Sequence, residues 1–266
     1  MFPIYQAIAY EKIELKGGST KPLVFTIDKN GVYIPYVVKI FSENQQFQYD
    51  ALAKECLAYT IAQEFELPQP DAALIMFGEE LLANIPEEIA QRLKQNTQSL
   101  HYGTQLMNDY ILFHKNFQGK DLETSDHETL FAFDALIYNL DRNYKKPNLL
   151  VRANDYLLID HELSLPISES FLRQAKENDF SYIYNNPKFS DHIFLPFLRE
   201  RMKKDVVNFS KFDILLGVLN ISKLEKVNEF LKTLNCSDKN FDTIKSYIYE
   251  IKRQRVKFIK SLNNFL

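Results

Sequence analysis

Residues 139–161 read Asn-Leu-Asp-Arg-Asn-Tyr-Lys-Lys-Pro-Asn-Leu-Leu-Val-Arg-Ala-Asn-Asp-Tyr-Leu-Leu-Ile-Asp-His, and this stretch decides the fold. Two short apolar runs, Leu-Leu-Val and Tyr-Leu-Leu-Ile, flank an Asn-Asp pair that is typical of a turn. The pattern predicts a loop followed by a β-hairpin. Asp141 precedes the hairpin, Asn148 opens it and Asp160 closes it. Three oxygen-bearing side chains are therefore expected at one end of the hairpin.

Such a cluster suits phosphoryl transfer. One carboxylate must orient or receive the proton of the attacking hydroxyl, while a carboxylate and an amide oxygen hold Mg²⁺ against the nucleotide phosphates. The plainer interpretation is a hairpin with polar turns, because Asp and Asn are common turn residues. The spacing alone does not decide between the two interpretations.

Composition limits the possible classes of protein. The chain has 266 residues, of which 45% are hydrophobic and 14% aromatic, enough for a sizeable core. The formal net charge of -3 gives no sign of binding to nucleic acid or to an anionic membrane. Two cysteines form neither a disulfide framework nor a zinc pattern, and no apolar run reaches membrane-spanning length. We expect a cytoplasmic protein without a signal peptide.

A glycine turn lies near the start of the chain. Residues 16–22 read Lys-Gly-Gly-Ser-Thr-Lys-Pro and separate strand-like residues at Ile13 and Leu15 from a second apolar run at 23–27. Glycines allow backbone N–H groups to approach an anion, and hydroxyls can add donors. An ordinary hairpin turn explains the segment equally well. The candidate phosphate-binding residues are Gly17, Gly18, Ser19 and Thr20.

A lysine and a glutamate form a second candidate pair. The Asp-Lys-Asn-Gly turn at 28–31 predicts a hairpin that leads into a strand at 32–41, where Lys39 interrupts apolar residues. A helix is expected at 49–65, with Glu55 beside its apolar face. Lys39 either lies at a sheet edge or faces a negative partner. Glu55 is either a solvated helix residue or the ion-pair partner that holds Lys39 towards nucleotide phosphates.

The predicted order of elements gives two lobes. A strand at 100–107 ends the first, and backbone groups at Gln105 and Met107 are candidates for binding an adenine edge. We expect an N-terminal lobe over residues 1–107 and a mostly helical C-terminal lobe over residues 108–266. Helices in the second lobe are expected at 129–140, 168–178, 191–207, 209–218, 223–234 and 242–258.

Several motifs in this order resemble the HipA-like kinase family, most closely its short single-domain bacterial branch. They are Gly-Gly-Ser-Thr-Lys-Pro, Tyr-Val-Val-Lys, Lys-Glu-Cys-Leu-Ala with Leu-Pro-Gln-Pro, His-Tyr-Gly-Thr, Asn-Leu-Asp-Arg-Asn with Pro-Asn-Leu-Leu-Val, and Leu-Leu-Ile-Asp-His. Together they cover about residues 13–165. The resemblance implies an α+β, protein-kinase-like fold with a small N-terminal antiparallel sheet and one helix, and a larger helical lobe.

The resemblance also implies roles for single residues. The glycine turn would cover the phosphates of ATP, and Lys39 would contact the α and β phosphates, braced by Glu55. Asp141 would be the catalytic base, and Arg142 would hold the catalytic loop. Asp160 would bind Mg²⁺, although Ile-Asp-His replaces the commoner Asp-Phe-Gly.

The sequence offers two candidates for the second magnesium ligand. Kinases place an asparagine five residues after the catalytic aspartate, and here that position is Lys146. Asn148, which directly precedes Leu-Leu-Val, is the first choice of ligand, and Asn143 is the second. Lys146 and its neighbour Lys145 either engage phosphate or lie in a solvated loop. His161 is expected to be structural.

Three functions remain open. The first is an ATP-dependent protein Ser/Thr kinase, for which the resemblance implies a toxin–antitoxin or defence system and a companion regulatory protein. The second is a small-molecule phosphotransferase of the aminoglycoside or choline kinase type, which a deep acidic pocket would favour. The third is a nucleotide-binding regulator with little activity, for which Lys146 is the argument. Autophosphorylation of Ser19 or Thr20 is a further hypothesis, because added negative charge would repel nucleotide phosphates.

Overall fold

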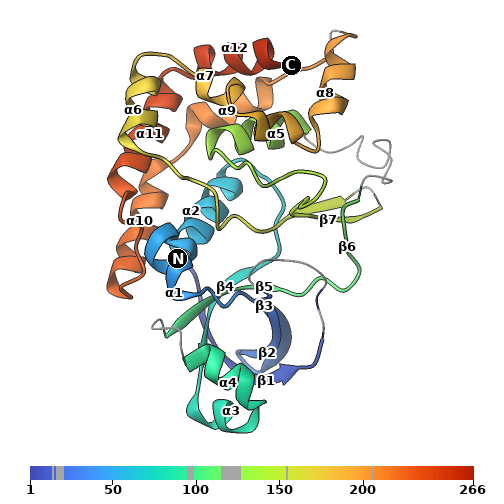
Figure 1. Cartoon of the computed structure of the whole chain (residues 1–266), viewed down its shortest axis with the longest axis vertical. Helices are drawn as coiled ribbons and strands as arrows, with labels where there is room; N and C mark the ends of the chain where they lie inside the picture. Colours follow the sequence, from blue (N-terminus) through green and yellow to red (C-terminus); the bar gives the residue numbers. More distant parts are fainter. Residues whose placement is uncertain (14, 16–20, 95–98, 115–126, 154, 205) are drawn as a thin grey trace.

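A barrel of strands and a larger helical region lie at opposite ends of the molecule, with a small second sheet between them (Figure 1). The computed structural model describes residues 1–13, 15, 21–94, 99–114, 127–153, 155–204 and 206–266. The glycine-turn residues 17–20 lie outside the described residues, so their predicted contact with phosphate stays a prediction.

The barrel is closed in the order β1-β2-β3-β5-β4. β1 pairs in parallel with β4, and the other neighbouring strands pair antiparallel. Closure removes the unpaired edges that an open sheet of this size would expose. The strands are β1 (Ile4–Glu11), β2 (Leu23–Lys29), β3 (Val32–Val38), β4 (Ala72–Phe77) and β5 (Leu100–Gln105).

The tight turn between β2 and β3 follows from its sequence. Asn30 and Gly31 have φ values of 55° and 85°, as a two-residue hairpin turn requires, and Asp28 accepts the Gly31 N–H at 2.6 Å. The first strand differs from our expectation. β1 ends at Glu11, and Ile13, which we expected within a strand, lies outside it and is 43% exposed.

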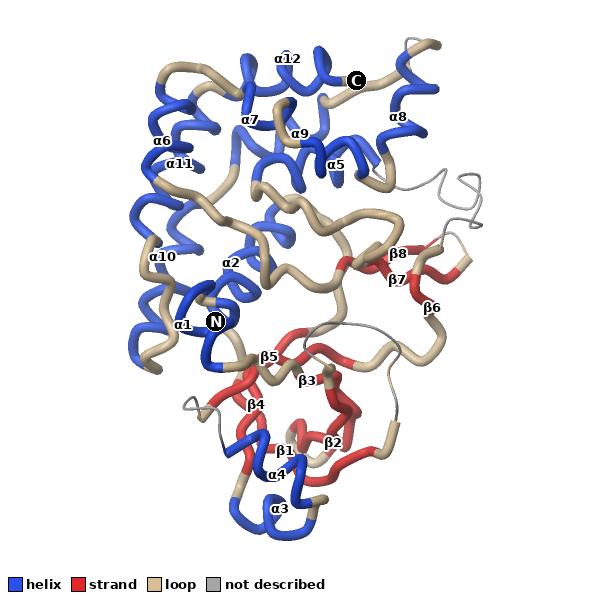
Figure 2. Tube along the Cα trace, viewed as in Figure 1, coloured by secondary structure: helices blue, strands red, loops and turns tan. Residues whose placement is uncertain are grey.

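Two helices follow β3 where one was expected over residues 49–65. Ser42 caps α1 (Glu43–Tyr49) in a capping box with Gln45. Asp50, with φ 46°, adopts a left-handed conformation that separates α1 from α2 (Ala51–Glu64). Most of α2 is buried, which fits its many alanines and its central course between the barrel and the helical region (Figure 2).

The second sheet carries the stretch that decided the fold. β7 (Leu149–Arg152) and β8 (Asp155–Leu158) form the expected hairpin, with Leu149 opposite Leu158. β6 (Ile111–Leu112), which follows the barrel in the chain, pairs with β7. The chain therefore passes from the last barrel strand directly to this sheet, and the hairpin lies between the two larger regions (Figure 2).

Helices form the rest of the second region, close to the expected positions. The helix expected at 129–140 ends at Leu136, because the chain turns through Tyr138 at φ 51°. The helix expected at 242–258 is divided at Gln254. The helices are α5 (His127–Leu136), α6 (Glu169–Lys176), α7 (Ser181–Tyr184), α8 (Leu195–Met202), α9 (Ser210–Val218), α10 (Ile221–Thr233), α11 (Phe241–Arg253) and α12 (Arg255–Phe265), with a 3₁₀ helix at Pro187–Asp191.

Two hydrophobic cores support this arrangement. The smaller lies inside the barrel and is extended by α3 (Glu79–Asn84) and α4 (Glu87–Lys94). The larger runs from α2 through the β7–β8 hairpin into the C-terminal helices. Because α2 shares its core with the hairpin, side chains on α2 and beside β8 are held at a fixed separation.

Candidate active site

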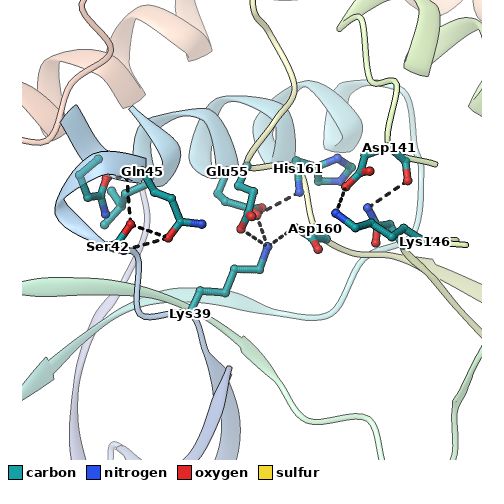
Figure 3. A network of polar contacts seen from close by, with 12 residues as sticks. Lys39, Ser42, Gln45, Glu55, Asp141, Lys146, Asp160 and His161 are labelled. Atoms are coloured by element: carbon teal, nitrogen blue, oxygen red, sulfur yellow. Dashed lines mark hydrogen bonds and ion pairs between the residues drawn. The ribbon is translucent and has the colours of Figure 1, made fainter. Parts of the chain in front are cut away.

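Lys39 lies just beyond β3 and points into a group of three carboxylates (Figure 3). Its backbone N–H donates to the Tyr102 carbonyl at 2.9 Å, which anchors the end of the strand. Its ammonium donates to Glu55 of α2, to Asp160 Oδ1 at 2.5 Å and to Glu162 Oε2 at 3.4 Å. The structure therefore brings together Lys39 and Glu55, which sequence reasoning had paired.

Burial and charge work against each other in this group. Burial alone would lower the pKa of Lys39, but Asp160, Glu55 and Glu162 outweigh it and raise that pKa, so the ammonium stays protonated. Burial raises the pKa of Glu55 to about 7, and the ion pair with Lys39 offsets only part of this effect. The pKa of Asp160 is lowered, because Lys39 outweighs the effect of burial.

The group has more negative than positive charge. Oxygens of Glu55, Asp160 and Glu162 lie within 4.8 Å of one another, and the Lys39 ammonium contacts all three side chains. Among the described residues, Glu55 Oε2 is buried and has no hydrogen-bond partner. Hard carboxylate oxygens with unbalanced charge are the donor set that Mg²⁺ prefers, so these residues fit a divalent cation.

Asp160 and His161 follow β8 in the chain. Asp160 has φ 64°, a left-handed conformation that is uncommon for a residue with a side chain. The next N–H, that of His161, donates to Glu55 Oε1 at 3.0 Å, which joins α2 to the hairpin. The His161 ring is buried edge-on against Phe133, and burial lowers its pKa to about 3. A neutral, packed imidazole agrees with the structural role expected for it.

Asp141 lies in the loop before β7, and its side chain is partly open to solvent. Its backbone N–H donates to Asn139 Oδ1 at 3.1 Å, and its carbonyl accepts from the Asn148 side chain at 3.4 Å. Lys146 Nζ lies 3.4 Å from Asp141 Oδ2. The carboxylate is thus held from its backbone and remains accessible to an acceptor hydroxyl.

Arg142 is completely buried beneath this loop. Its guanidinium donates to Asp134 of α5, with Nε 2.6 Å from Oδ2 and Nη2 3.3 Å from Oδ1, and to the Asn148 carbonyl. Asp134 also accepts from Asn139 Nδ2 at 2.8 Å and contacts His192 Nε2 at 3.0 Å. Arg142 therefore joins the Asp141 loop, the start of the hairpin and α5, as its predicted role requires.

Asn148 and Asn143 occupy different positions in the loop. Asn148 is buried with φ 45°, and its carbonyl accepts from Arg142 and from the Ile159 N–H, next to Asp160. Asn143 Oδ1 accepts the N–H groups of Lys145 and Lys146 at 3.0 and 3.1 Å. The amide oxygen of Asn143 is thus used within its own loop, which favours Asn148 as the ligand.

The candidate adenine-binding residues are partly engaged within the protein. The Gln105 N–H donates to the Asp71 carbonyl at 2.8 Å, and the Met107 carbonyl accepts the Tyr110 N–H at 3.2 Å. Their contact with a nucleotide stays a prediction.

Sequence reasoning missed three residues of the site: Asp134, Glu162 and His192. Asp134 had a usable signal, because it is a lone carboxylate in the apolar run Leu-Phe-Ala-Phe-Asp-Ala-Leu. Glu162 lies two residues after Asp160, on the same short segment. His192 carries no such signal, since it is 58 residues from its partner Asp134.

A cavity of about 730 Å³ opens beside Asp141. Two tyrosines, two leucines and two prolines contribute apolar surface to it: Tyr138, Tyr144, Leu140, Leu163, Pro166 and Pro196. Its charged lining residues are two carboxylates and two lysines, Asp141, Asp191, Lys145 and Lys188, so the cavity is not acidic. A larger cavity of about 1070 Å³ lies between the barrel and α10 and contains none of the predicted site residues.

A strand barrel is followed by a lysine that pairs with a glutamate of the next helix, beside a loop and hairpin with two aspartates. This arrangement defines a protein-kinase-like fold. The family model of the HipA-like kinases matches residues 11–212, and the chain belongs to this family. Both the resemblance drawn from the motifs and the α+β fold class are thereby confirmed.

A solved structure supports the same fold. The chain is similar to the crystal structure of the Helicobacter pylori proinflammatory kinase CtkA, with a TM-score of 0.54, 12% identity and 96% of each chain covered. At this identity the similarity shows the fold alone. No curated protein sequence matches the chain. Among the described helices, none is long and apolar enough to cross a membrane.

Proposed function

We propose that this protein is an ATP-dependent kinase that transfers the γ-phosphoryl group of Mg-ATP to a serine or threonine hydroxyl of a protein. The observation that carries the proposal is the contact of Lys39 with both Glu55 and Asp160, in one group with Asp141 on the facing loop. Such a group supplies a cation for phosphates, a carboxylate for metal and a base for the acceptor.

The chain's own residues divide the work between binding and proton transfer. Lys39 binds phosphate oxygens, and Glu55 keeps the Lys39 ammonium beside Asp160. Asp160, with Asn148 as its candidate partner, would hold Mg²⁺, which when bound would neutralise charge on the phosphates. The acceptor oxygen bonds to the γ-phosphorus while the bond to the β–γ bridging oxygen breaks. ADP leaves, and the hydroxyl proton passes to Asp141.

Arg142 contributes through position and not through contact with substrate. Its bonds to Asp134 and to the Asn148 carbonyl fix the loop on which Asp141 lies. Positioning of this kind is a main contribution to catalysis in kinases, because phosphoryl transfer needs little covalent catalysis by the protein.

The cavity beside Asp141 favours a peptide acceptor over a cationic small molecule. An aminoglycoside or choline would require surplus negative charge, and this cavity has as many lysines as carboxylates. Its tyrosine and proline surface suits the side chains that flank a hydroxyl residue in a polypeptide.

The test is incubation with Mg-ATP, followed by ADP quantification and intact-mass measurement, for wild type, Asp141→Asn and Asp160→Asn. Asp155→Asn is the matched control, because Asp155 lies on the same hairpin but at the surface. We expect ADP or a phosphate adduct with wild type and the control, and a loss of about 10²–10⁴-fold in Asp141→Asn.

A second candidate function is a nucleotide-binding regulator with slow turnover, which Lys146 at the usual asparagine position favours. Stabilisation by ATP without ADP release would select it. If ATP neither stabilised the protein nor was converted to ADP, both functions would be refuted.

A further inference from the structure

Lys146 lies in this site, and the mechanism proposed above for the kinase gives it no role. It lies five residues after Asp141, where kinases place the asparagine that holds a second Mg²⁺. A protonated lysine has three donors and no acceptor, so it cannot ligate a cation and repels one. With Asn148 assigned as the partner of Asp160, position 146 supplies a positive charge in place of a further amide ligand.

The loop fixes the backbone that carries this charge. The Lys146 N–H donates to Asn143 Oδ1 at 3.1 Å, and the Lys146 carbonyl accepts the Asn143 N–H at 3.0 Å. Pro147 follows and restricts Lys146 to extended conformations. Two hydrogen bonds and a proline thus limit the side chain to one region of the site.

The ammonium points to the reacting end of the site. Lys146 Nζ lies 3.4 Å from Asp141 Oδ2, and its charge also acts on Asp160 (Figure 3). Asp141 and Asp160 are the residues assigned to the acceptor hydroxyl and to the metal, so a group near both adjoins the path of the transferred phosphoryl group. Its side chain is 47% exposed, which leaves it free to move from Asp141 to a phosphate oxygen.

We propose that the Lys146 ammonium takes the place of the second metal ion, so that this kinase binds a single divalent cation together with its nucleotide. The inference rests on the proposed function. A lysine supplies one positive charge where a second Mg²⁺ would supply two, and it is always present whatever the metal concentration. Phosphoryl transfer is therefore expected to saturate once ATP is complexed, with no further rise at higher free Mg²⁺.

The test counts metal ions instead of turnover. Mn²⁺ replaces Mg²⁺, and bound Mn²⁺ per protein is measured by electron paramagnetic resonance with a saturating non-hydrolysable ATP analogue. We expect one Mn²⁺ in wild type and two in Lys146→Asn, which restores the amide ligand. Lys145→Asn is the matched control, since it places the same amide one position earlier, and we expect it to bind one.

A third variant separates charge from ligation. Lys146→Met removes the ammonium without adding a ligand, so it is expected to bind one Mn²⁺ and to lose about 10- to 100-fold in turnover, the equivalent of a charge-assisted hydrogen bond. Thermal unfolding checks that each variant is folded.

Two Mn²⁺ ions in nucleotide-bound wild type would overturn the inference and leave the proposed function intact. A single Mn²⁺ in folded Lys146→Asn would overturn it as well. Failure of wild type to bind the nucleotide analogue would overturn the proposed function, and the inference with it.

Discussion

Replacing Asp134 by asparagine tests whether the buried network under the Asp141 loop stabilises this fold. Asp134 is 0% exposed and faces four donors, from Arg142, Asn139 and His192. The His192 ring donates through Nε2, because its Nδ1 accepts the Phe194 N–H. An asparagine keeps the shape but has one acceptor oxygen, and its NH₂ group would face donors.

The expected loss is large because the guanidinium of Arg142 would remain buried without its countercharge. Breaking a buried ion pair by removing one partner costs about 3–5 kcal/mol. For a chain of this size, 1 kcal/mol shifts Tm by about 2 °C, so Tm should fall by roughly 6–10 °C.

The assay is urea and thermal unfolding followed by circular dichroism, with Glu229→Gln as the control. Glu229 pairs with Lys232 on the surface of α10, where its side chain is 67% exposed. Removing an exposed pair of this kind changes stability by about 0–1 kcal/mol. Equal losses in Asp134→Asn and Glu229→Gln would refute the reasoning.

The pH dependence of the same variant gives a second check. Burial alone would raise the pKa of Asp134, but Arg142 and His192 outweigh it and lower that pKa to about 2. A lowered carboxyl pKa adds stability above the ordinary value, near 3.8, and loses it as pH falls through about 2. The difference in the free energy of unfolding between wild type and Asp134→Asn should therefore be constant from pH 5 to 8. As pH falls from 4 to below 2, this difference in the free energy of unfolding should decrease by about 2–3 kcal/mol. A gap that widened on acidification would contradict this linkage.

Three further predictions follow from other parts of the structure. Lys39→Met should lower ADP release by roughly 10²–10³-fold, because the Lys39 ammonium contacts all three carboxylates and is the proposed phosphate-binding cation; near-normal release would be evidence against its role. His161 has a pKa lowered to about 3 by burial, so wild type should lose stability as pH falls from 6.5 towards 3, and His161→Phe should lose less in urea titrations at pH 4 and pH 7. Gly103→Ala places a Cβ 2.8 Å from Ile75 in the barrel core and should cost about 1–3 kcal/mol, whereas an unchanged urea midpoint would show that Ile75 moves aside freely.

Local chemistry made much of the fold predictable. The Asn30–Gly31 turn and the two runs of the hairpin each rest on neighbouring residues, and the structure has both. The pairing of Lys39 with Glu55 was predicted from a family motif, since their separation of sixteen residues crosses a helix boundary that sequence did not show.

Closure of the barrel could not be predicted from the same signals. β1 buries only Ala7 fully, so its eight residues lack a clear alternation of apolar and polar positions. Its partners are β2 and, in parallel, β4, more than sixty residues further along the chain. Contacts of this range depend on the assembled barrel and leave no local pattern.

The two halves of the site depend on one buried arginine. On one side, Arg142 adjoins Asp141 in the chain and is held by Asp134. On the other, it donates to the Asn148 carbonyl, which also accepts the N–H of Ile159, the residue before Asp160. The position of the proposed base and the positions of the proposed metal ligands are therefore fixed by the same guanidinium. Loss of its countercharge in Asp134→Asn should consequently weaken Mn²⁺ binding together with stability. A variant that unfolded more easily but bound Mn²⁺ as tightly as wild type would show that the hairpin holds Asn148 and Asp160 without Arg142.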